Sequence, residues 1–228
     1  MTKDEIIKKL RANKNPKNIV GMARFGINSK NTLGINIPIL RKMAKNIGKN
    51  HELAIELWDS NVHEAQLLAT FIDDPKMVNI EQMNRWVTDF DSWDVCDQAC
   101  MSLFDKTPFA FKMAKTWANH EREFTRRAGF ALMAALAFHD KITKDKDFII
   151  FFPLIKKYSV DERNFVKKAV NWALRQIGKR NLNLRNLALV CAKDIIKINS
   201  KSAKWIANDA IRELESVKII SQIRRKNG

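Results

Sequence analysis

Apolar residues recur every three to four positions along most of this chain, and this spacing constrains its fold more than any other feature. A period near 3.6 residues is typical of amphipathic helices, whereas strands need strict alternation. Only seven glycines and five prolines interrupt the 228 residues, so few positions break a helix. The pattern predicts helices over 2–13, 37–48, 51–59, 61–72, 76–89, 93–106, 108–118, 121–138, 145–157, 161–178, 183–197 and 201–217.

About twelve such helices with short connections indicate either a bundle or stacked helical pairs. Related phrases recur where second helices of pairs are expected, beginning at Glu64, Arg126 and Lys167. Their alanines, Ala65, Ala128 and Ala169, are 63 and 41 residues apart, which fits an irregular HEAT-type period near 40. We therefore predict the all-α class: a right-handed α-solenoid of HEAT-like antiparallel helix pairs, forming one domain over 1–228 with a concave basic face.

The formal net charge of +16 is distributed unevenly. Residues 1–51 carry 12 Lys+Arg and 2 Asp+Glu, residues 52–105 carry 2 and 12, residues 106–155 carry 9 and 5, and residues 156–228 carry 18 and 6. Two basic arms around an acidic segment suit a curved solenoid that grips a polyanion. The alternative is a generally basic surface without a specific partner.

The location and the redox compartment follow from a few sequence features. Three cysteines are an odd number, which indicates a reducing compartment rather than a disulfide framework. The longest apolar stretch, 148–155, is too short to span a bilayer, and the charged N-terminus does not resemble a signal peptide. We expect a cytoplasmic protein without membrane contact.

Motifs for metals or nucleotides are missing from the sequence. Cys96 and Cys100 have a spacing that suits one helical face, but without a second ligand pair we interpret them as buried apolar residues. The chain has no glycine-rich phosphate loop, nucleophile elbow or His-Glu-x-x-His motif. We therefore predict that the protein uses neither a metal nor a nucleotide cofactor.

The segment 161–179 places a tryptophan among basic residues. On a helix, its core face is formed by Val166, Ala169, Val170, Ala173 and Ile177. Trp172 falls instead in the sector of Lys168, Arg175 and Lys179. Lysine and arginine there can contact phosphates while the indole packs on a sugar or base. Packing of Trp172 at the rim of the core is the alternative, and the periodicity does not decide between them.

A second group of candidate residues begins at Ser92, a good N-cap residue. Cys96, Ala99, Cys100 and Leu103 would form the buried face of that helix. Trp93 and Asp97 are then stacked one turn apart beside this face. A carboxylate beside an indole is partly desolvated and needs a cation or a hydrogen-bond donor, although an ordinary salt bridge explains it equally well. The helix dipole fully explains Asp94.

A third candidate is Arg127, at the edge of the helix expected over 121–138. The core face of that helix includes Phe124, Ala128, Ala131 and Ala135. An edge arginine is usually solvated or salt-bridged, so its position alone does not assign a function.

Four stretches together carry a family resemblance. They are Gly21-Met22-Ala23-Arg24-Phe25-Gly26, Ser92-Trp93-Asp94-Val95-Cys96-Asp97, the segment from Phe165 to Arg175, and Ser202-Ala203-Lys204-Trp205-Ile206-Ala207. With them the chain resembles the DNA alkylation repair family, the AlkD-like HEAT-repeat DNA glycosylases, along nearly its whole length. The stretch from Phe165 to Arg175 is the most specific of the four.

The resemblance implies excision of cationic N3- and N7-alkylated purines from double-stranded DNA by a monomer without metal or cofactor. It places Trp93 and Asp97 beside the lesion, with Trp172 and Arg175 as a second pair and Arg127 on a phosphate. It makes Asp97, Trp93 and Trp172 the catalytic residues. The expected DNA-binding residues are Arg127, Arg175, Lys168, Phe25, Arg24 and Lys179.

Two departures from the family pattern affect this interpretation. Phe25 stands where some members have tyrosine, and Ser92 stands where some have a further tryptophan. The family is thought to leave the lesion in the helix, in contrast to enzymes that flip the base. Two alternatives stay open: a non-catalytic relative that recognises bent or branched DNA by shape and phosphates, and a protein-binding HEAT scaffold.

Overall fold

The computed structural model describes residues 1–227, and the side chains of residues 1–225. Within this range the regular structure is helical and contains no strand, which confirms the predicted all-α class. The chain is divided into two compact units after Phe109. The single domain over 1–228 stays a prediction.

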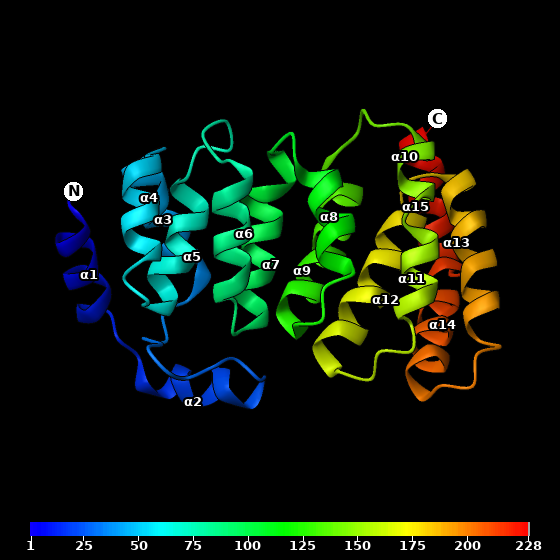
Figure 1. Ribbon diagram of the computed structural model, residues 1–228, viewed down its shortest axis with the longest axis horizontal. Helices are drawn as coiled ribbons and strands as arrows, with labels where there is room; N and C mark the ends of the chain where they lie inside the picture. Colours follow the sequence, from blue (N-terminus) through cyan, green and yellow to red (C-terminus); the bar gives the residue numbers. More distant parts are fainter. Residues whose placement is uncertain (228) are drawn as a thin grey trace. The chain divides into compact units, whose positions relative to one another are not determined.

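The first unit is organised around α5, which packs against α1, α3, α4 and α7 (Figure 1). Trp58 and Trp86 stack in its core with ring centroids 3.9 Å apart. Phe90 packs edge-on against Trp58, and Phe104 is tilted against Trp86. Its elements are α1 (Lys3–Ala12), α2 (Pro16–Arg24), α3 (Ile37–Ile47), α4 (His51–Trp58), α5 (His63–Ile72), α6 (Ile80–Asp89), α7 (Trp93–Ser102) and the short 3-10 helix η1 (Phe104–Lys106).

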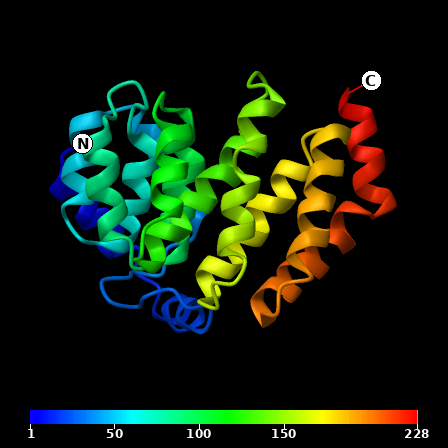
Figure 2. The ribbon, with the colours of Figure 1, turned by 45° about the vertical axis from the view of Figure 1, so that its right-hand side comes forward.

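The second unit is a row of helix pairs, in which α8, α11 and α13 pack on α9, α12 and α14. Helix α12 lies between α9 and α14 (Figures 1 and 2). A Cβ on Gly129 would lie 2.3 Å from the backbone nitrogen of Ala118, so glycine permits the close contact of α8 with α9. The elements are α8 (Ala110–Ala118), α9 (Glu123–His139), α10 (Asp145–Ile149), α11 (Phe152–Tyr158), α12 (Asn164–Gly178), α13 (Leu182–Ile195), α14 (Lys201–Leu214) and α15 (Val217–Asn227).

Helices α5, α7, α9, α12 and α14 are the second helices of successive pairs. They begin roughly 30 to 40 residues apart, which explains the irregular period in the sequence. The 63-residue offset between Ala65 and Ala128 spans two repeats, because α7 lies between them without the recurring phrase. The handedness of the solenoid and its concave basic face stay predictions.

Three helical features differ from the sequence prediction. Helices α2 and α15 were not expected, and the helix expected over 145–157 is divided into α10 and α11. Pro153 causes the division, because its ring clashes with the carbonyl four residues earlier, at Ile149, where α10 ends. Pro153 then occupies the first turn of α11, where proline is well tolerated. Among the described helices, none is long and apolar enough to cross a bilayer.

Candidate nucleic-acid interface

Trp93 and Asp97 lie one turn apart at the edge of the α7 core. The buried face of α7 holds Cys96, Ala99 and Cys100, with Leu103 buried just beyond it, as the sequence predicts, and it also includes Val95. Both Trp93 and Asp97 are half-buried. The indole Nε1 of Trp93 donates a hydrogen bond to the carbonyl oxygen of Phe25 at 3.0 Å, which fixes the ring beside the end of α2.

Helix α2 presents Arg24 and Phe25 to solvent. None of the side chains of α2 is buried, and Phe25, which caps its C-terminus, is 74% exposed. Because Trp93 holds the Phe25 carbonyl, the structure brings Phe25 and Trp93 together, with Asp97 one turn further along α7. In the first unit, the predicted site residues therefore gather on one side.

The segment after Phe25 is attached to the body of the first unit by a buried carboxylate. Glu64 of α5 is buried and accepts hydrogen bonds from the backbone N–H groups of Leu33 at 2.8 Å, Gly34 at 2.7 Å and Ile35 at 3.2 Å. Gly34 has φ of +78°, and a Cβ there would lie 2.3 Å from the Asn15 carbonyl oxygen. The turn therefore depends on both glycine and the carboxylate.

Two further contacts hold this segment, one to the residues just before α7 and one to the start of α5. Asn28 donates to the carboxylate of Asp91 at 2.6 Å, and the backbone N–H of His63 donates to the Asn31 carbonyl at 3.1 Å. These two contacts were not predicted from the sequence. Their partners are 63 and 32 positions apart along the chain, and only the register between helix pairs brings them together.

Asp94 has a larger role than the helix dipole assigned to it. Its carboxylate lies 2.8 Å from Nε2 of the buried His63 and accepts a hydrogen bond from the Ser92 hydroxyl at 2.7 Å. Ser92 is the N-cap residue, but its side chain does not cap a helical N–H group. The interpretation of Asp94 as a simple dipole cap was therefore incomplete, because it also joins α7 to α5.

The His63–Asp94 pair shifts both pKa values toward the charged forms. Burial alone would lower the pKa of His63, but the hydrogen bond and charge of Asp94, with smaller contributions from Glu64 and Asp91, raise it above 6.5. Burial likewise opposes ionisation of Asp94, yet the hydrogen bond and charge of His63 hold the Asp94 pKa below 3.8. The ion pair is therefore complete at mildly acidic pH.

We expect the pair to give the first unit a pH-dependent stability. The contribution of His63 is full below its unfolded pKa and is lost as pH rises through the raised folded value. The contribution of Asp94 is lost only as pH falls below about 4. In urea titrations from pH 6 to 9, the fall in unfolding free energy should be smaller for His63→Gln than for wild type. An unchanged slope in His63→Gln would contradict the assignment.

Cys96 and Cys100 are buried free thiols, as predicted. Burial, followed by the neighbouring Cys96, raises the pKa of Cys100 well above its ordinary value, so this thiol stays protonated. Across the described residues, no group of three or more histidine, cysteine, aspartate or glutamate side chains has a metal-binding arrangement.

In the second unit, α12 has the core face predicted from the sequence. Val166, Ala169, Val170, Ala173 and Ile177 are all fully buried. Lys168 is exposed and Trp172 is half-buried, so the indole lies between the core and the surface. This partial burial fits both packing of Trp172 at the rim of the core and contact of Trp172 with DNA.

Arg175 and Lys179 are both paired with acidic side chains of α14, so they are less available to DNA than unpaired cations would be. Arg175 forms ion pairs with Glu213 and, at 3.5 Å, with Asp209 of α14. Lys179 lies 2.7 Å from the same Glu213. Burial opposes ionisation of Glu213, but Lys179 and Arg175 lower its pKa below the ordinary value. Two of the three cations that the sequence places beside Trp172 are therefore paired with acidic residues of α14.

Arg127 was expected at the edge of α9, but it is only 5% exposed. Its Nη1 donates to the carbonyl oxygen of Phe165 on α12 at 2.6 Å, and the rings of Phe124 and Phe165 stack beside it. The edge position was wrong, because the contact between α9 and α12 encloses the guanidinium. Its contact with a phosphate stays a prediction.

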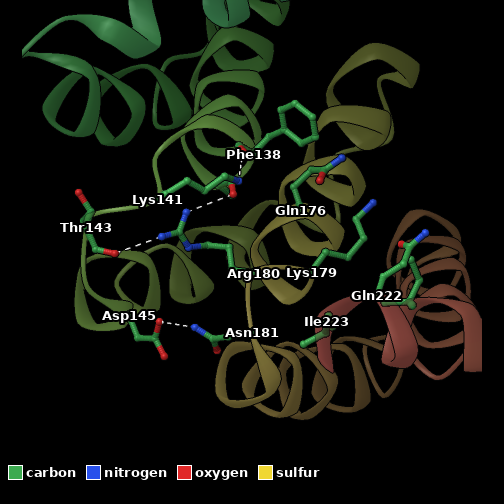
Figure 3. A pocket seen from close by; sticks show the side chains of 12 residues that line it. Phe138, Lys141, Thr143, Asp145, Gln176, Lys179, Arg180, Asn181, Gln222 and Ile223 are labelled. Atoms are coloured by element: carbon green, nitrogen blue, oxygen red, sulfur yellow. Dashed lines mark hydrogen bonds between the residues drawn. The ribbon is translucent and has the colours of Figure 1, made fainter. Parts of the chain in front are cut away.

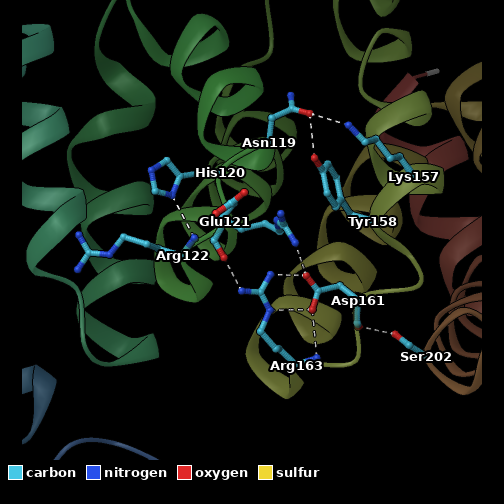
Figure 4. A network of polar contacts seen from close by, with 10 residues as sticks. Asn119, His120, Glu121, Arg122, Lys157, Tyr158, Asp161, Arg163 and Ser202 are labelled. Atoms are coloured by element: carbon cyan, nitrogen blue, oxygen red, sulfur yellow. Dashed lines mark hydrogen bonds and ion pairs between the residues drawn. The ribbon is translucent and has the colours of Figure 1, made fainter.

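A polar network joins the beginnings of α9, α12 and α14 next to Arg127 (Figure 4). Asp161 pairs with Arg126 at 2.6 Å and with Arg163 at 2.5 Å. Burial opposes ionisation of Asp161, but the hydrogen bonds from Arg163 and Arg126 lower its pKa. Arg126 also lies over the ring of Tyr158. Because Asp161 bridges Arg126 and Arg163, Arg126 links α9 to the segment that precedes α12.

A cavity of about 690 Å³ opens at the other end of α12 (Figure 3). Phe138, Gln176, Lys179 and Gln222 are among its lining residues. Arg180 lines one wall of the cavity. Its guanidinium donates hydrogen bonds to the carbonyl oxygens of Ala137, Asp140 and Thr143 and lies over the Phe148 ring. These contacts fix the 140–144 loop, so the role of Arg180 is structural.

The net charge is concentrated in the second unit. Residues 110–228 carry 26 Lys+Arg and 11 Asp+Glu, whereas residues 1–109 carry 15 and 14. Of the predicted site residues, Arg24, Phe25, Trp93 and Asp97 lie in the first unit and Arg127, Lys168, Trp172, Arg175 and Lys179 in the second. Their convergence on one face stays a prediction.

The sequence profile of the DNA alkylation repair enzyme family matches residues 6–214. The chain belongs to this family. Two full-length relatives are Lin0241 of Listeria innocua serovar 6a, 25% identical over 224 residues, and Lmo0209 of Listeria monocytogenes serovar 1/2a, 23% identical over 230 residues. The first alignment covers 96% of this chain and 98% of the relative, and the second covers 99% of both.

A similar solved structure is described as one of a new family of proteins related to the HEAT-like repeat DNA glycosylases with affinity for branched DNA structures. The TM-score is 0.78 at 18% identity, over 93% of this chain and 95% of the other. The likeness shows that this member of the alkylation repair family has the HEAT-like repeat fold, as the sequence predicted.

Proposed function

We propose that this chain is a DNA glycosylase that removes cationic N3- and N7-alkylated purines, such as 7-methylguanine and 3-methyladenine, from double-stranded DNA. The carrying observation is the placement of the half-buried Asp97 one turn from Trp93, whose indole in turn bonds the carbonyl of the exposed Phe25. Membership of the alkylation repair family supports the choice of reaction. The protein would act as a monomer without metal or cofactor.

The reaction needs little more than a negative charge and an oriented water. An alkylated purine already carries positive charge, so it leaves with the electron pair of the N-glycosidic bond as a neutral base. Asp97 would stabilise the oxocarbenium-like sugar that forms and would orient the water that adds to C1′. A proton of that water would then pass to solvent. Trp93 and Trp172 would cover the deoxyribose and exclude other water.

The remaining predicted residues would hold the DNA. Lys168 and Arg24 are exposed and suit phosphates, and Phe25 presents a ring to the backbone or a groove. Arg175 and Lys179 would contact DNA only at the cost of weakening their pairs with Glu213, and Arg127, which is only 5% exposed, would first have to become accessible.

Base release from methylated duplex DNA tests this proposal. We expect the full chain, in excess over DNA, to release 7-methylguanine or 3-methyladenine faster than a protein-free incubation, with chromatography of the free bases as the measurement. Unmethylated DNA of the same sequence is the control and should yield no base. A rate equal to the spontaneous one for both lesions would refute the glycosylase.

A second candidate function is recognition of branched DNA without base release. The similar structure carries that affinity, and the pairing of Arg175 and Lys179 with acidic residues reduces the charge available beside Trp172. This candidate predicts steeply salt-dependent binding to a three-way junction and spontaneous rates of base loss.

A further inference from the structure

An exposed tryptophan on α14 has no role in the reaction proposed above. Trp205 is 42% exposed, although its neighbours Ser202, Ala203, Ile206 and Ala207 are buried. The ammonium group of Lys167 lies 5.3 Å from the centroid of its ring. An indole left partly in water can still stack on another aromatic group, and the ammonium beside it attracts anions.

Trp205 belongs to a polar stripe along α14. Lys201, Trp205, Asn208 and Arg212 are spaced at intervals of three or four residues and are all exposed, so they share one side of the helix. We name these four residues the α14 stripe. It combines cations, an amide and an aromatic ring, whereas the opposite side of α14 is apolar and packed.

The contacts of α14 with α12 hold this stripe in a fixed position. The amide of Asn171 donates to the Ile206 carbonyl at 3.1 Å in the buried contact. The Ser202 hydroxyl donates to the Asp161 carbonyl at 2.8 Å (Figure 4). Hydrogen bonds therefore anchor α14 at the residues next to Trp205 and three before it. A ring held in place loses little conformational entropy when a ligand stacks on it.

We propose that Trp205 is a stacking site for an unpaired nucleobase of DNA, with Lys167 and Lys201 near the adjoining phosphates. Bases inside a duplex have both faces covered by their neighbours, so an exposed indole stacks best on a base in a single-stranded arm or at a branch point. The inference rests on the proposed DNA binding, but it does not depend on base excision.

The charge around Trp205 favours DNA over an apolar protein partner. An apolar partner would have to bury Lys167 and Lys201 without counter-charges, which is unfavourable. Arg212 already pairs with Asp209, so the stripe presents its uncompensated charge near Trp205. A DNA strand supplies a base for the ring and phosphates for the lysines within one nucleotide.

Fluorescence anisotropy with the full chain tests the inference. The probes are a duplex that carries an unpaired thymine arm and a fully paired duplex of equal length. Trp205→Ala should weaken binding to the armed probe about 10-fold and leave binding to the paired duplex within twofold, whereas Trp205→Phe should restore most of the affinity. Phe138→Ala is a matched control, because Phe138 is also an exposed ring of the second unit with a lysine over it. It should affect neither probe.

The outcomes separate this inference from the proposed glycosylase. Unchanged binding of the armed probe by Trp205→Ala, or an equal loss on both probes, overturns the stacking site while base release stays intact. If wild type binds neither probe, both the stacking site and the DNA-dependent function are overturned. Base release from methylated duplex by Trp205→Ala should equal that of wild type, since that substrate has no unpaired arm.

Discussion

Substitution of Asp97 by asparagine should slow release of alkylated purines on the order of 100-fold, the usual effect of removing one preorganised electrostatic group from a reaction centre. Asparagine has the same size and still accepts a hydrogen bond from water, so the geometry at the edge of α7 should persist. What disappears is the negative charge that opposes the cationic sugar. The rate of the bond-breaking step should therefore fall while the protein stays folded.

Single-turnover measurements separate this loss from weaker binding. With protein in excess, the rate of base release reports the chemical step, and anisotropy on the same duplex reports affinity. Affinity should be equal or higher for Asp97→Asn, because a carboxylate repels the phosphate backbone. Asp59→Asn is the matched control, since Asp59 is an exposed carboxylate of the first unit, and it should keep the wild-type rate. Undiminished release by Asp97→Asn would exclude this residue as the catalytic group.

Periodicity predicted the elements with a buried stripe. Every residue predicted for the core faces of α7 and α12 is buried, because each helix has an apolar stripe at helical spacing, although Val95, Asn171 and Leu174 are buried as well. Helix α2 was missed for the opposite reason: it buries no side chain and contains Gly21. Its start was nevertheless signalled by Asn15 as N-cap and Pro16 in the first turn.

The electrostatic partners of the site could not be predicted from the sequence. Arg175 and Glu213 are 38 residues apart, and their pairing depends on how α14 stacks on α12. The same holds for Arg127, which periodicity placed at an edge that α12 covers. A helical period defines which side of a helix is apolar, but it does not show which neighbouring helix contacts the flanking polar residues.

Glu64 illustrates a buried functional anchor that looks like a surface residue in the sequence. It begins the recurring phrase of α5, where glutamate is common in a first turn. Its spacing gave no reason to expect burial. The structure shows it deep in the first unit, where it accepts three backbone hydrogen bonds from residues 33–35.

Replacement of Glu64 by alanine should lower the free energy of unfolding more than His63→Gln, Asp97→Asn or Trp205→Ala. The backbone N–H groups of Leu33, Gly34 and Ile35 would lose their acceptor, and an unsatisfied buried group costs about 1–3 kcal/mol. We expect the free energy of unfolding to fall by about 4 kcal/mol in urea titrations. Glu56→Ala, at an exposed position of α4, should change it by less than about 0.5 kcal/mol.

A milder substitution connects this anchor to the site. Glu64→Gln keeps one oxygen for Gly34 and Ile35 but turns an amide toward the Leu33 N–H, so the segment that carries Phe25 should loosen while the core stays folded. Hydrogen exchange at residues 33–35 should accelerate. Base release should also fall, because the Phe25 carbonyl that orients Trp93 belongs to the same segment. Faster exchange with unchanged base release would show that the anchor stabilises the fold without positioning the site.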